Sequence, residues 1–277
     1  MIPGILVISH GSRLAEWVRL VDESAAEAAD AVAKQLADND GGSQQANGVK
    51  EVLFEASYLE LVEGRLIQDG VDRLAAAGVT DLFVLPLFIS SGSTHVDDIA
   101  QSFGFPPKVE GRAGDMEPFH VPDGIRVTMG EPIDADEEIA QRLWSNLQEL
   151  SDNPPKESLL LIAHGNDEAG FYERYERGMR MLAEQVRALG GLARARTAML
   201  LPNEASDVLG GMLEEHPEET VLVAPLFLSS GYFTKSVIPS RLAGHNYRYN
   251  GKALLPDSAV ARWMVRQSLR WLRGLEV

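Results

Sequence analysis

The chain has 277 residues, 45% of them hydrophobic, and carries a formal net charge of −16 with no cysteine. This length is enough for two ordinary hydrophobic cores. The lack of cysteine excludes disulfides, thiolate metal sites, cysteine-held iron-sulfur clusters and a cysteine nucleophile, which leaves histidine and carboxylate as metal ligands. The negative charge repels polyanions and therefore argues against nucleic acid as a partner.

The apolar runs of the sequence are short. They lie near positions 4–9, 82–89, 159–163 and 221–228, and each is far shorter than the roughly 20 residues that span a bilayer. The first run has no basic leader and no small-residue cleavage site, which indicates a strand and not a signal peptide. We therefore expect a cytoplasmic protein with no membrane partner.

The first half predicts strands that alternate with amphipathic helices. A strand over Ile5–Ser9 precedes an alanine-rich helix over Glu16–Leu36, and a strand over Ala56–Leu61 precedes a helix over Gly64–Ala77. A third strand over Asp81–Ile89 is apolar almost throughout, and a loop, a strand and a helix follow it. Continuous apolar strands of this kind are typical of a mostly parallel sheet with helices on both faces. The sequence therefore predicts an α/β fold.

The same order of elements recurs in the second half. Three segments are repeated: Gly4–Ser12 as Leu159–Asp167, Leu87–Ile99 as Leu226–Ile238, and Thr128–Arg142 as Tyr249–Trp263. We expect two tandem domains, 1–150 with the functional site and 151–277 as a degenerate repeat of the same fold. The first half is longer by the polar run 38–48 and the Pro/Gly-rich stretch 104–124, which lack core periodicity and are expected as surface loops.

Two histidines follow predicted strands of the first half. His10 comes directly after the first strand, and His95 ends a Ser/Gly-rich loop after the third. Because ligands of open α/β sheets bind beyond the carboxyl ends of the strands, we expect both imidazoles at one edge of the sheet. Two neutral imidazoles with a carboxylate suit a divalent ion such as Co, Fe or Ni. The alternative for each is a structural histidine that is bonded to a loop carbonyl.

Glu60 and Glu63 stand where the second predicted strand gives way to a helix. A carboxylate there could complete a metal shell or accept a proton, although a glutamate at a helix N-terminus is also favoured by the helix dipole alone. In the second half the counterpart of Glu60 is apolar, near Met199 or Leu200, and Thr234 stands in place of His95. Both groups are absent from the second half, which is the pattern expected of a site that has lost its function.

The loop before His95 is built from small residues whose backbone could approach a flat ligand: Ser90, Ser91, Gly92, Ser93 and Thr94. Asp97 and Asp98 could orient an imidazole or could simply begin a helix. The nearest cations in sequence are Arg13, Arg65, Lys108 and Arg112. There is no phosphate loop, no strand-linked GxGxxG and no G-x-S-x-G elbow, so a nucleotide cofactor has no visible seat.

The HGSR strand end, the E-x-x-E turn and the loop ending in His95 together resemble the class II chelatases of the long CbiX/SirB type, the sirohydrochlorin cobaltochelatases and ferrochelatases. The resemblance covers both halves and implies two tandem chelatase-like domains. In that family the two histidines bind the incoming metal and the first also accepts a proton, which carries over to His10 and His95. The second glutamate and the loop contact the tetrapyrrole, which carries over to Glu63 and to Ser90–His95. The family usually has proline where this chain has Gly64.

The resemblance implies insertion of a divalent ion into sirohydrochlorin without ATP, with Co²⁺ favoured and Fe²⁺ or Ni²⁺ the other options, toward cobalamin or siroheme. Glu60 is an added candidate for proton transfer. No cofactor beyond the substrate metal is implied, and the partners are the tetrapyrrole and the ion. The duplication favours a monomer of pseudo-equivalent domains or a weak homodimer. Because the substrate is an octacarboxylate and the chain is acidic, we expect a local basic rim that includes Arg13.

Three other functions are open from sequence. A histidine phosphatase would use His10 as its nucleophile, but such enzymes place arginine immediately before that histidine, and here Ser9 precedes it. A metal or tetrapyrrole carrier would use the same ligands without turnover. A purely structural pair of domains leaves unexplained why one repeat alone holds His95 and the paired glutamates.

Overall fold

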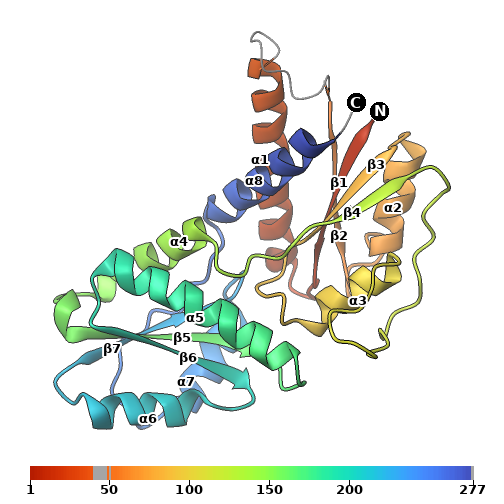
Figure 1. The fold of residues 1–277 in the computed structure, drawn as a ribbon. Coiled ribbons are helices and arrows are strands. Elements are labelled where there is room, and N and C mark those ends of the chain that lie inside the picture. The colour runs from red at the N-terminus through yellow and green to blue at the C-terminus, as the bar shows by residue number, and fades with distance from the viewer. Residues whose placement is uncertain (40–48, 50, 276–277) are drawn as a thin grey trace. The chain divides into compact units, whose positions relative to one another are not determined.

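The computed structural model describes residues 1–39, 49 and 51–275, which form two compact units. The first unit takes the described residues of Met1–Phe88, His95–Pro132 and Val260–Val277, and the second takes Ile89–Thr94 and Ile133–Ala259. Each unit contains one parallel sheet, and the strand order is β2-β1-β3-β4 in the first and β6-β5-β7 in the second. The predicted α/β fold with two tandem repeats is confirmed (Figure 1).

The elements of the first unit follow the predicted order, with an extra helix after the third strand. They are β1 (Pro3–Ser9), α1 (Ala15–Asn39), β2 (Leu53–Tyr58), α2 (Ile67–Ala76), β3 (Asp81–Pro86), α3 (Thr94–Ser102), β4 (Arg126–Met129) and, from the end of the chain, α8 (Ala259–Gly274). Helix α1 runs on to Asn39, and the rest of the expected loop at 38–48 lies outside the described residues.

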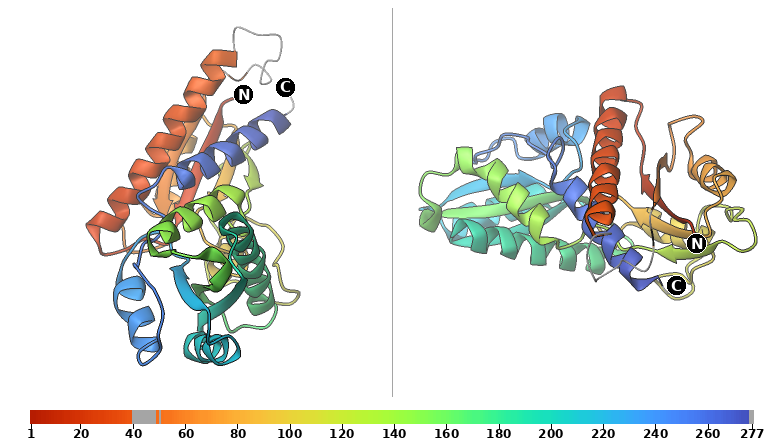
Figure 2. Two further views of the ribbon diagram at one scale, coloured as in Figure 1. Left: turned by 90° about the vertical axis from the view of Figure 1, so that its left-hand side faces the viewer. Right: turned by 90° about the horizontal axis from the view of Figure 1, so that it is seen from above.

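Both faces of the first sheet are covered by helices. Alternate residues of β1, Leu6 and Ile8, pack with Ile67 and Val71 of α2 and with Ile99 of α3. The opposite face is covered by α1 and α8, where the ring of Phe83 stacks on Trp271 at a centroid distance of 5.1 Å. Helices α1 and α2 lie on opposite sides of the sheet (Figure 1, and from above in Figure 2). The central strand β1 is buried along its whole length, which explains its unbroken apolar sequence.

The second unit repeats this plan with a smaller sheet. Its elements are α4 (Glu137–Leu147), β5 (Glu157–Gly165), α5 (Phe171–Gly190), β6 (Arg194–Leu201), α6 (Ala205–Glu215), β7 (Thr220–Pro225), a π-helical turn at Phe233–Val237 and α7 (Ile238–Arg241). Leu160 and Ile162 of β5 pack with Leu209 and Met212 of α6, while α5 covers the other face of β5 and β6. In place of a fourth strand there is an isolated bridge between Leu222 and Arg248.

The compact units are not composed like the two sequence repeats. Helix α4 closes the first repeat in sequence but packs on α5 in the second unit, and α8 closes the second repeat but belongs to the first unit. The expected boundary at residue 150 therefore follows the repeats and not the packing. No helix in the part of the chain that the structure describes is both long enough and apolar enough to cross a bilayer.

Candidate metal-binding site

The carboxyl ends of β1 and β2 are joined by backbone hydrogen bonds that bring His10 beside Glu60. The amide of Leu59 donates to the Ser9 carbonyl at 2.8 Å, and the amide of Glu60 donates to the His10 carbonyl at 3.1 Å. Gly11 has a φ of +96°, and a Cβ there would lie 2.0 Å from the Glu60 carbonyl oxygen. Only glycine fits this crossing, so the turn after the first histidine is fixed by sequence.

The hydrogen bond of the His10 ring determines which nitrogen is available to a ligand. Nδ1 lies 3.2 Å from the Gly11 carbonyl oxygen, which can only accept, so this contact favours the tautomer with the proton on Nδ1. The lone pair then lies on Nε2. The side chain is 42% exposed, so a metal ion can reach this nitrogen.

The second imidazole comes from the first turn of α3. The ring centroids of His10 and His95 are 5.1 Å apart, with an interplanar angle of 74°. His95 is exposed, and the Phe88 ring also lies near it, at a centroid distance of 6.4 Å. The structure thus brings together the two histidines that the sequence singles out, at the strand ends of one sheet.

The two candidate glutamates differ in position. The Glu60 carboxylate lies 3.8 Å from His10 Nδ1, beyond hydrogen-bonding distance and on the side of the ring away from Nε2. It therefore interacts strongly with the ring only when the imidazole is protonated. Glu63 is exposed. Its expected contact with substrate stays a prediction.

The small-residue loop before His95 packs within the second unit. The Ser91 amide donates to the Asp134 carboxylate at 2.9 Å, and the Gly92 amide donates to the hydroxyl of Ser90, which is buried. A Cβ at Gly92 would lie 2.4 Å from the Tyr175 amide nitrogen at the start of α5. Close packing against α5 thus accounts for at least one of the small residues, and substrate contact by the loop stays a prediction.

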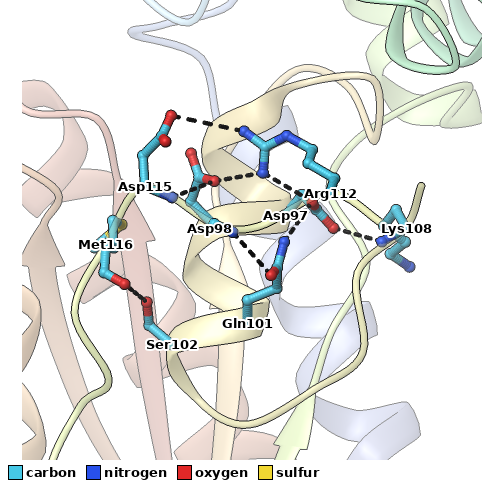
Figure 3. A network of polar contacts seen from close by, with 9 residues as sticks. Asp97, Asp98, Gln101, Ser102, Lys108, Arg112, Asp115 and Met116 are labelled. Atoms are coloured by element: carbon cyan, nitrogen blue, oxygen red, sulfur yellow. Dashed lines mark hydrogen bonds and ion pairs between the residues drawn. The ribbon is translucent and has the colours of Figure 1, made fainter. Parts of the chain in front are cut away.

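A buried ion-pair network fixes helix α3 (Figure 3). The Arg112 guanidinium donates to Asp97 at 3.0 Å and to Asp98 at 2.6 Å, and Asp97 also accepts from the Lys108 amide. The exposed fractions of the side chains are 11% for Arg112, 0% for Asp97 and 6% for Asp98. These carboxylates therefore bind the 104–124 segment to α3. The segment has no helix or strand and lies at the surface, as the sequence predicts. Its attachment through Arg112 could not be predicted, because the partners lie more than ten residues apart and no local pattern marks them.

The other cations near the site are mostly engaged by acidic residues. Arg65 forms a two-pronged pair with Asp22 at 2.8 and 2.7 Å, and Lys108 lies 3.3 Å from Glu131. Arg13 is exposed in the turn that follows His10. The expected basic rim that includes Arg13 stays a prediction.

The second unit keeps the first histidine and replaces the other two groups by apolar side chains. A Cβ at Gly165 would lie 2.3 Å from the Leu201 carbonyl, and one at Gly11 would lie 2.0 Å from the Glu60 carbonyl. Leu201 is therefore the counterpart of Glu60, apolar as expected and next to the predicted position near Met199 or Leu200. The Phe233 ring lies 5.1 Å from His164 at 85°, which is the place of His95. Alignment pairs His95 with Thr234, but the π-helical turn at 233–237 shifts the register, and the Thr234 side chain is buried.

One further group of metal-ligand types lies at the opposite end of the second sheet. His216, Glu218 and Glu219 have ligand atoms within 4.8 Å of one another. Both oxygens of Glu219 are already engaged, one by Arg194 and the other by the Ser158 hydroxyl. This group is therefore better explained as part of a surface ion-pair network.

Fold and site define a duplicated parallel α/β protein whose first repeat alone presents a pair of imidazoles at its strand ends. The chain belongs to the CbiX family, whose model matches residues 4–150 and again 158–267. The predicted resemblance to class II chelatases of the CbiX type is thereby confirmed.

Individual relatives are more distant. A sirohydrochlorin cobaltochelatase of Sulfurisphaera tokodaii is 25% identical over 149 residues, which cover 53% of this chain and 92% of that protein. The structure is similar to that of SirB from Bacillus subtilis with Fe³⁺, with a TM-score of 0.71, 19% identity and coverage of 99% of this chain and 96% of that one. The cobalt complex of SirB from Bacillus subtilis subspecies spizizenii gives a TM-score of 0.64, 18% identity and the same coverage. At this identity the solved structures show the fold.

Proposed function

We propose that this protein inserts a divalent metal ion into sirohydrochlorin without ATP, with Co²⁺ favoured and Fe²⁺ or Ni²⁺ the other options. The observation that carries the proposal is the pair of imidazoles, His10 and His95, 5.1 Å apart at the strand ends of the first sheet. Neutral imidazoles bind first-row divalent ions and also accept protons near neutral pH. Membership of the CbiX family and a relative that is named a sirohydrochlorin cobaltochelatase support the substrate.

The geometry suggests a division of labour. His10 and His95 replace part of the water shell of the incoming ion and deliver it to the centre of the macrocycle. When the ion leaves, the free Nε2 of His10 accepts a pyrrole proton, and the ring becomes a cation. The Glu60 carboxylate, 3.8 Å from Nδ1, then stabilises that cation. Glu63 and the loop Ser90–Thr94 are proposed to contact the tetrapyrrole.

Metal insertion is followed by anaerobic absorbance spectroscopy with sirohydrochlorin and Co²⁺, Fe²⁺ or Ni²⁺. We expect rapid metallation by the wild type, and rates near the uncatalysed reaction for His10→Ala and His95→Ala. His120→Ala is the matched control, because His120 is an exposed histidine of the same unit, joined to Gln68 only through its backbone. It should retain the wild-type rate. The order of rates among the metals identifies the substrate ion, and with it cobalamin or siroheme as the product pathway.

Two results would contradict the proposal. Tight binding of metal or tetrapyrrole with no acceleration would indicate a carrier, and no binding of either would remove sirohydrochlorin as the ligand. The proposal needs no resident cofactor beyond the substrate ion. Sedimentation velocity of the same preparation tests whether the protein is a monomer or a weak homodimer.

A further inference from the structure

The second unit has an imidazole, His164, whose contacts favour the same tautomer as those of His10. His164 lies near the end of β5, and its Nδ1 is 3.1 Å from the Gly165 carbonyl oxygen. This contact again favours the proton on Nδ1 and leaves the lone pair on Nε2. The side chain is exposed. His164 is therefore ready to donate one bond to a metal.

The neighbours of His164 are apolar and unusually exposed. Phe233 lies edge-on to the imidazole, and Tyr232 lies beside Phe233 at a centroid distance of 5.8 Å. The exposed fraction is 72% for Tyr232 and 42% for Leu201, the counterpart of Glu60. Phe227 stacks beneath Phe233 at 5.6 Å and holds it in place. We call His164, Leu201, Tyr232 and Phe233 the His164 patch.

The His164 patch is poorly suited to a free ion. A hydrated divalent ion needs several protein ligands, and Leu201 and Phe233 stand where the first unit has a carboxylate and a second imidazole. The nearby Glu204 carboxylate is engaged by the Tyr172 hydroxyl at 2.8 Å and the Met199 amide at 3.0 Å. Among the four side chains of the patch, His164 supplies the one imidazole nitrogen.

A metal that is already held in a macrocycle has the opposite requirements. Its equatorial positions are filled by ring nitrogens, so a single axial ligand completes the bond to the protein. The flat conjugated ring around it gains from contact with aromatic and aliphatic side chains. Lys235, exposed in the same π-helical turn, adds a cation for a ring that carries carboxylates. The patch matches such a ligand in each respect.

We propose that the His164 patch binds a metallated tetrapyrrole through one axial bond from His164 Nε2. The identity of the macrocycle, the product of the first unit, rests on the proposed function, whereas the axial bond does not. The second repeat then has a role of its own: it holds the finished metal complex by a group that cannot bind the free ion well.

The axial bond is tested with cobalt(II) uroporphyrin, an octacarboxylate metalloporphyrin, by electron paramagnetic resonance under anaerobic conditions. The full chain carries His10→Ala and His95→Ala, which remove the imidazoles of the first unit. A single axial nitrogen splits the cobalt lines into triplets, and we expect this splitting in the double variant. It should disappear when His164→Ala is added and persist when His216→Ala is added instead. A double variant with no splitting, or a triple variant with His164→Ala that keeps it, would overturn the proposal.

Binding titrations separate the axial bond from ring stacking. In the double variant, His164→Ala should lower the affinity for cobalt uroporphyrin by about tenfold or more. The affinity for metal-free uroporphyrin should stay unchanged. Leu201→Glu places at this position the residue type that the first unit has in Glu60. It should lower the affinity for both porphyrins by charge repulsion, whereas Leu201→Met should lower the affinity for neither. Equal weakening of both probes by His164→Ala would overturn the axial bond. Because neither readout needs metal insertion, a wild type that fails to metallate sirohydrochlorin would remove the proposed function and leave this result standing.

Discussion

His10 Nδ1 lies 3.2 Å from a main-chain oxygen, which favours a proton on that nitrogen, and the Glu60 carboxylate lies farther from it, at 3.8 Å. This order of distances separates two roles that a glutamate beside a histidine can have. A carboxylate that fixed the tautomer would be needed for metal binding, whereas one that stabilises the imidazolium is needed only after proton transfer. The geometry favours the second role for Glu60.

Replacement of Glu60 by glutamine tests this role. We expect Glu60→Gln to lower kcat for metal insertion by about two- to fivefold, because a half-exposed ion pair contributes up to about 1 kcal/mol. The affinity for Co²⁺, measured by isothermal titration, should stay close to that of the wild type. His10→Ala, by comparison, should lose Co²⁺ affinity. If Glu60→Gln loses affinity as strongly as His10→Ala, Glu60 is itself a ligand.

Gly11 is the second residue on which the site depends. We expect Gly11→Ala to destabilise the fold by about 1–3 kcal/mol and to abolish Co²⁺ binding, because its Cβ would collide with the Glu60 carbonyl at a positive φ. Gly64→Ala is the matched control, since Gly64 also has a positive φ, +74°, but has open space around it. It should lose stability without loss of Co²⁺ binding. Denaturation in urea and metal titration measure the two effects, and equal Co²⁺ affinities in the two variants would refute the explanation.

Among the elements, α3 is held by charge as much as by apolar packing. We expect Arg112→Met to lower the free energy of unfolding by about 3–5 kcal/mol, because it leaves the buried Asp97 and Asp98 without their cation. Arg19→Met removes an exposed arginine that pairs with Glu16 and Glu23 on α1, and should cost less than about 1 kcal/mol. Guanidinium denaturation compares the two. Similar small losses in both would show that the Arg112 network is solvated in solution.

The start of β5 predicts an acid-sensitive contribution to stability. Burial would raise the pKa of Glu157, but hydrogen bonds from the Ser151 hydroxyl and from the amides of Asn153 and Asp152, together with Arg248, hold this pKa below its ordinary value of 4.5. Because the folded-state pKa is lowered, the stabilisation is complete above the unfolded-state value and is lost as the pH falls below it. Glu157→Gln should therefore unfold more easily at pH 7 and approach the wild type below about pH 4. A difference in unfolding free energy that does not change with pH would contradict this assignment.

Local sequence patterns correctly predicted the long helix and the buried strand at the start of the chain. The strand at β1 and the helix at α1 follow from continuous apolar residues and helical spacing. For helix α3 the sequence predicts only a possible helix start at Asp97 and Asp98 and no bounds, because the helix is short and begins inside a loop rich in serine and glycine. The second strand was placed over Ala56–Leu61 and lies at Leu53–Tyr58, because the chain turns at Leu59 to pair with the end of β1.

Some residues of the candidate site could likewise be predicted from local sequence, and others could not. His10 and His95 could be selected because each follows a predicted strand, and parallel strands end at one edge. The partner of Asp97 and Asp98 could not be found, since Arg112 comes from a loop without periodicity. The counterpart of His95 was misplaced by one residue, because alignment has no information about a π-helical turn.

On the scale of the whole molecule, the last helix of each sequence repeat belongs to the compact unit of the other repeat. Helix α4 packs in the second unit, and α8 belongs to the first. A fragment 1–150 lacks α8, so Phe83 loses the stacked ring of Trp271, and α1 alone remains on that face of the first sheet. We expect this fragment to bind a hydrophobic dye and to unfold without a cooperative transition. Residues 1–132 joined by a glycine-serine linker to 259–277 should unfold cooperatively, as followed by circular dichroism. Cooperative unfolding of 1–150 alone would show that α8 is dispensable.

The assignment of α8 to the first unit also determines the order in which the two units can be completed during synthesis. The first sheet is synthesised early, but the helix that completes its unit, α8, is synthesised after every element of the second unit. At about 5–20 residues per second, the delay between β4 and α8 is on the order of ten seconds. During that interval the His10 and His95 edge belongs to an unfinished unit, while the second sheet already has its own helices. We therefore expect metal binding by the first unit to appear only after α8 has been synthesised, although its ligands are among the first hundred residues made.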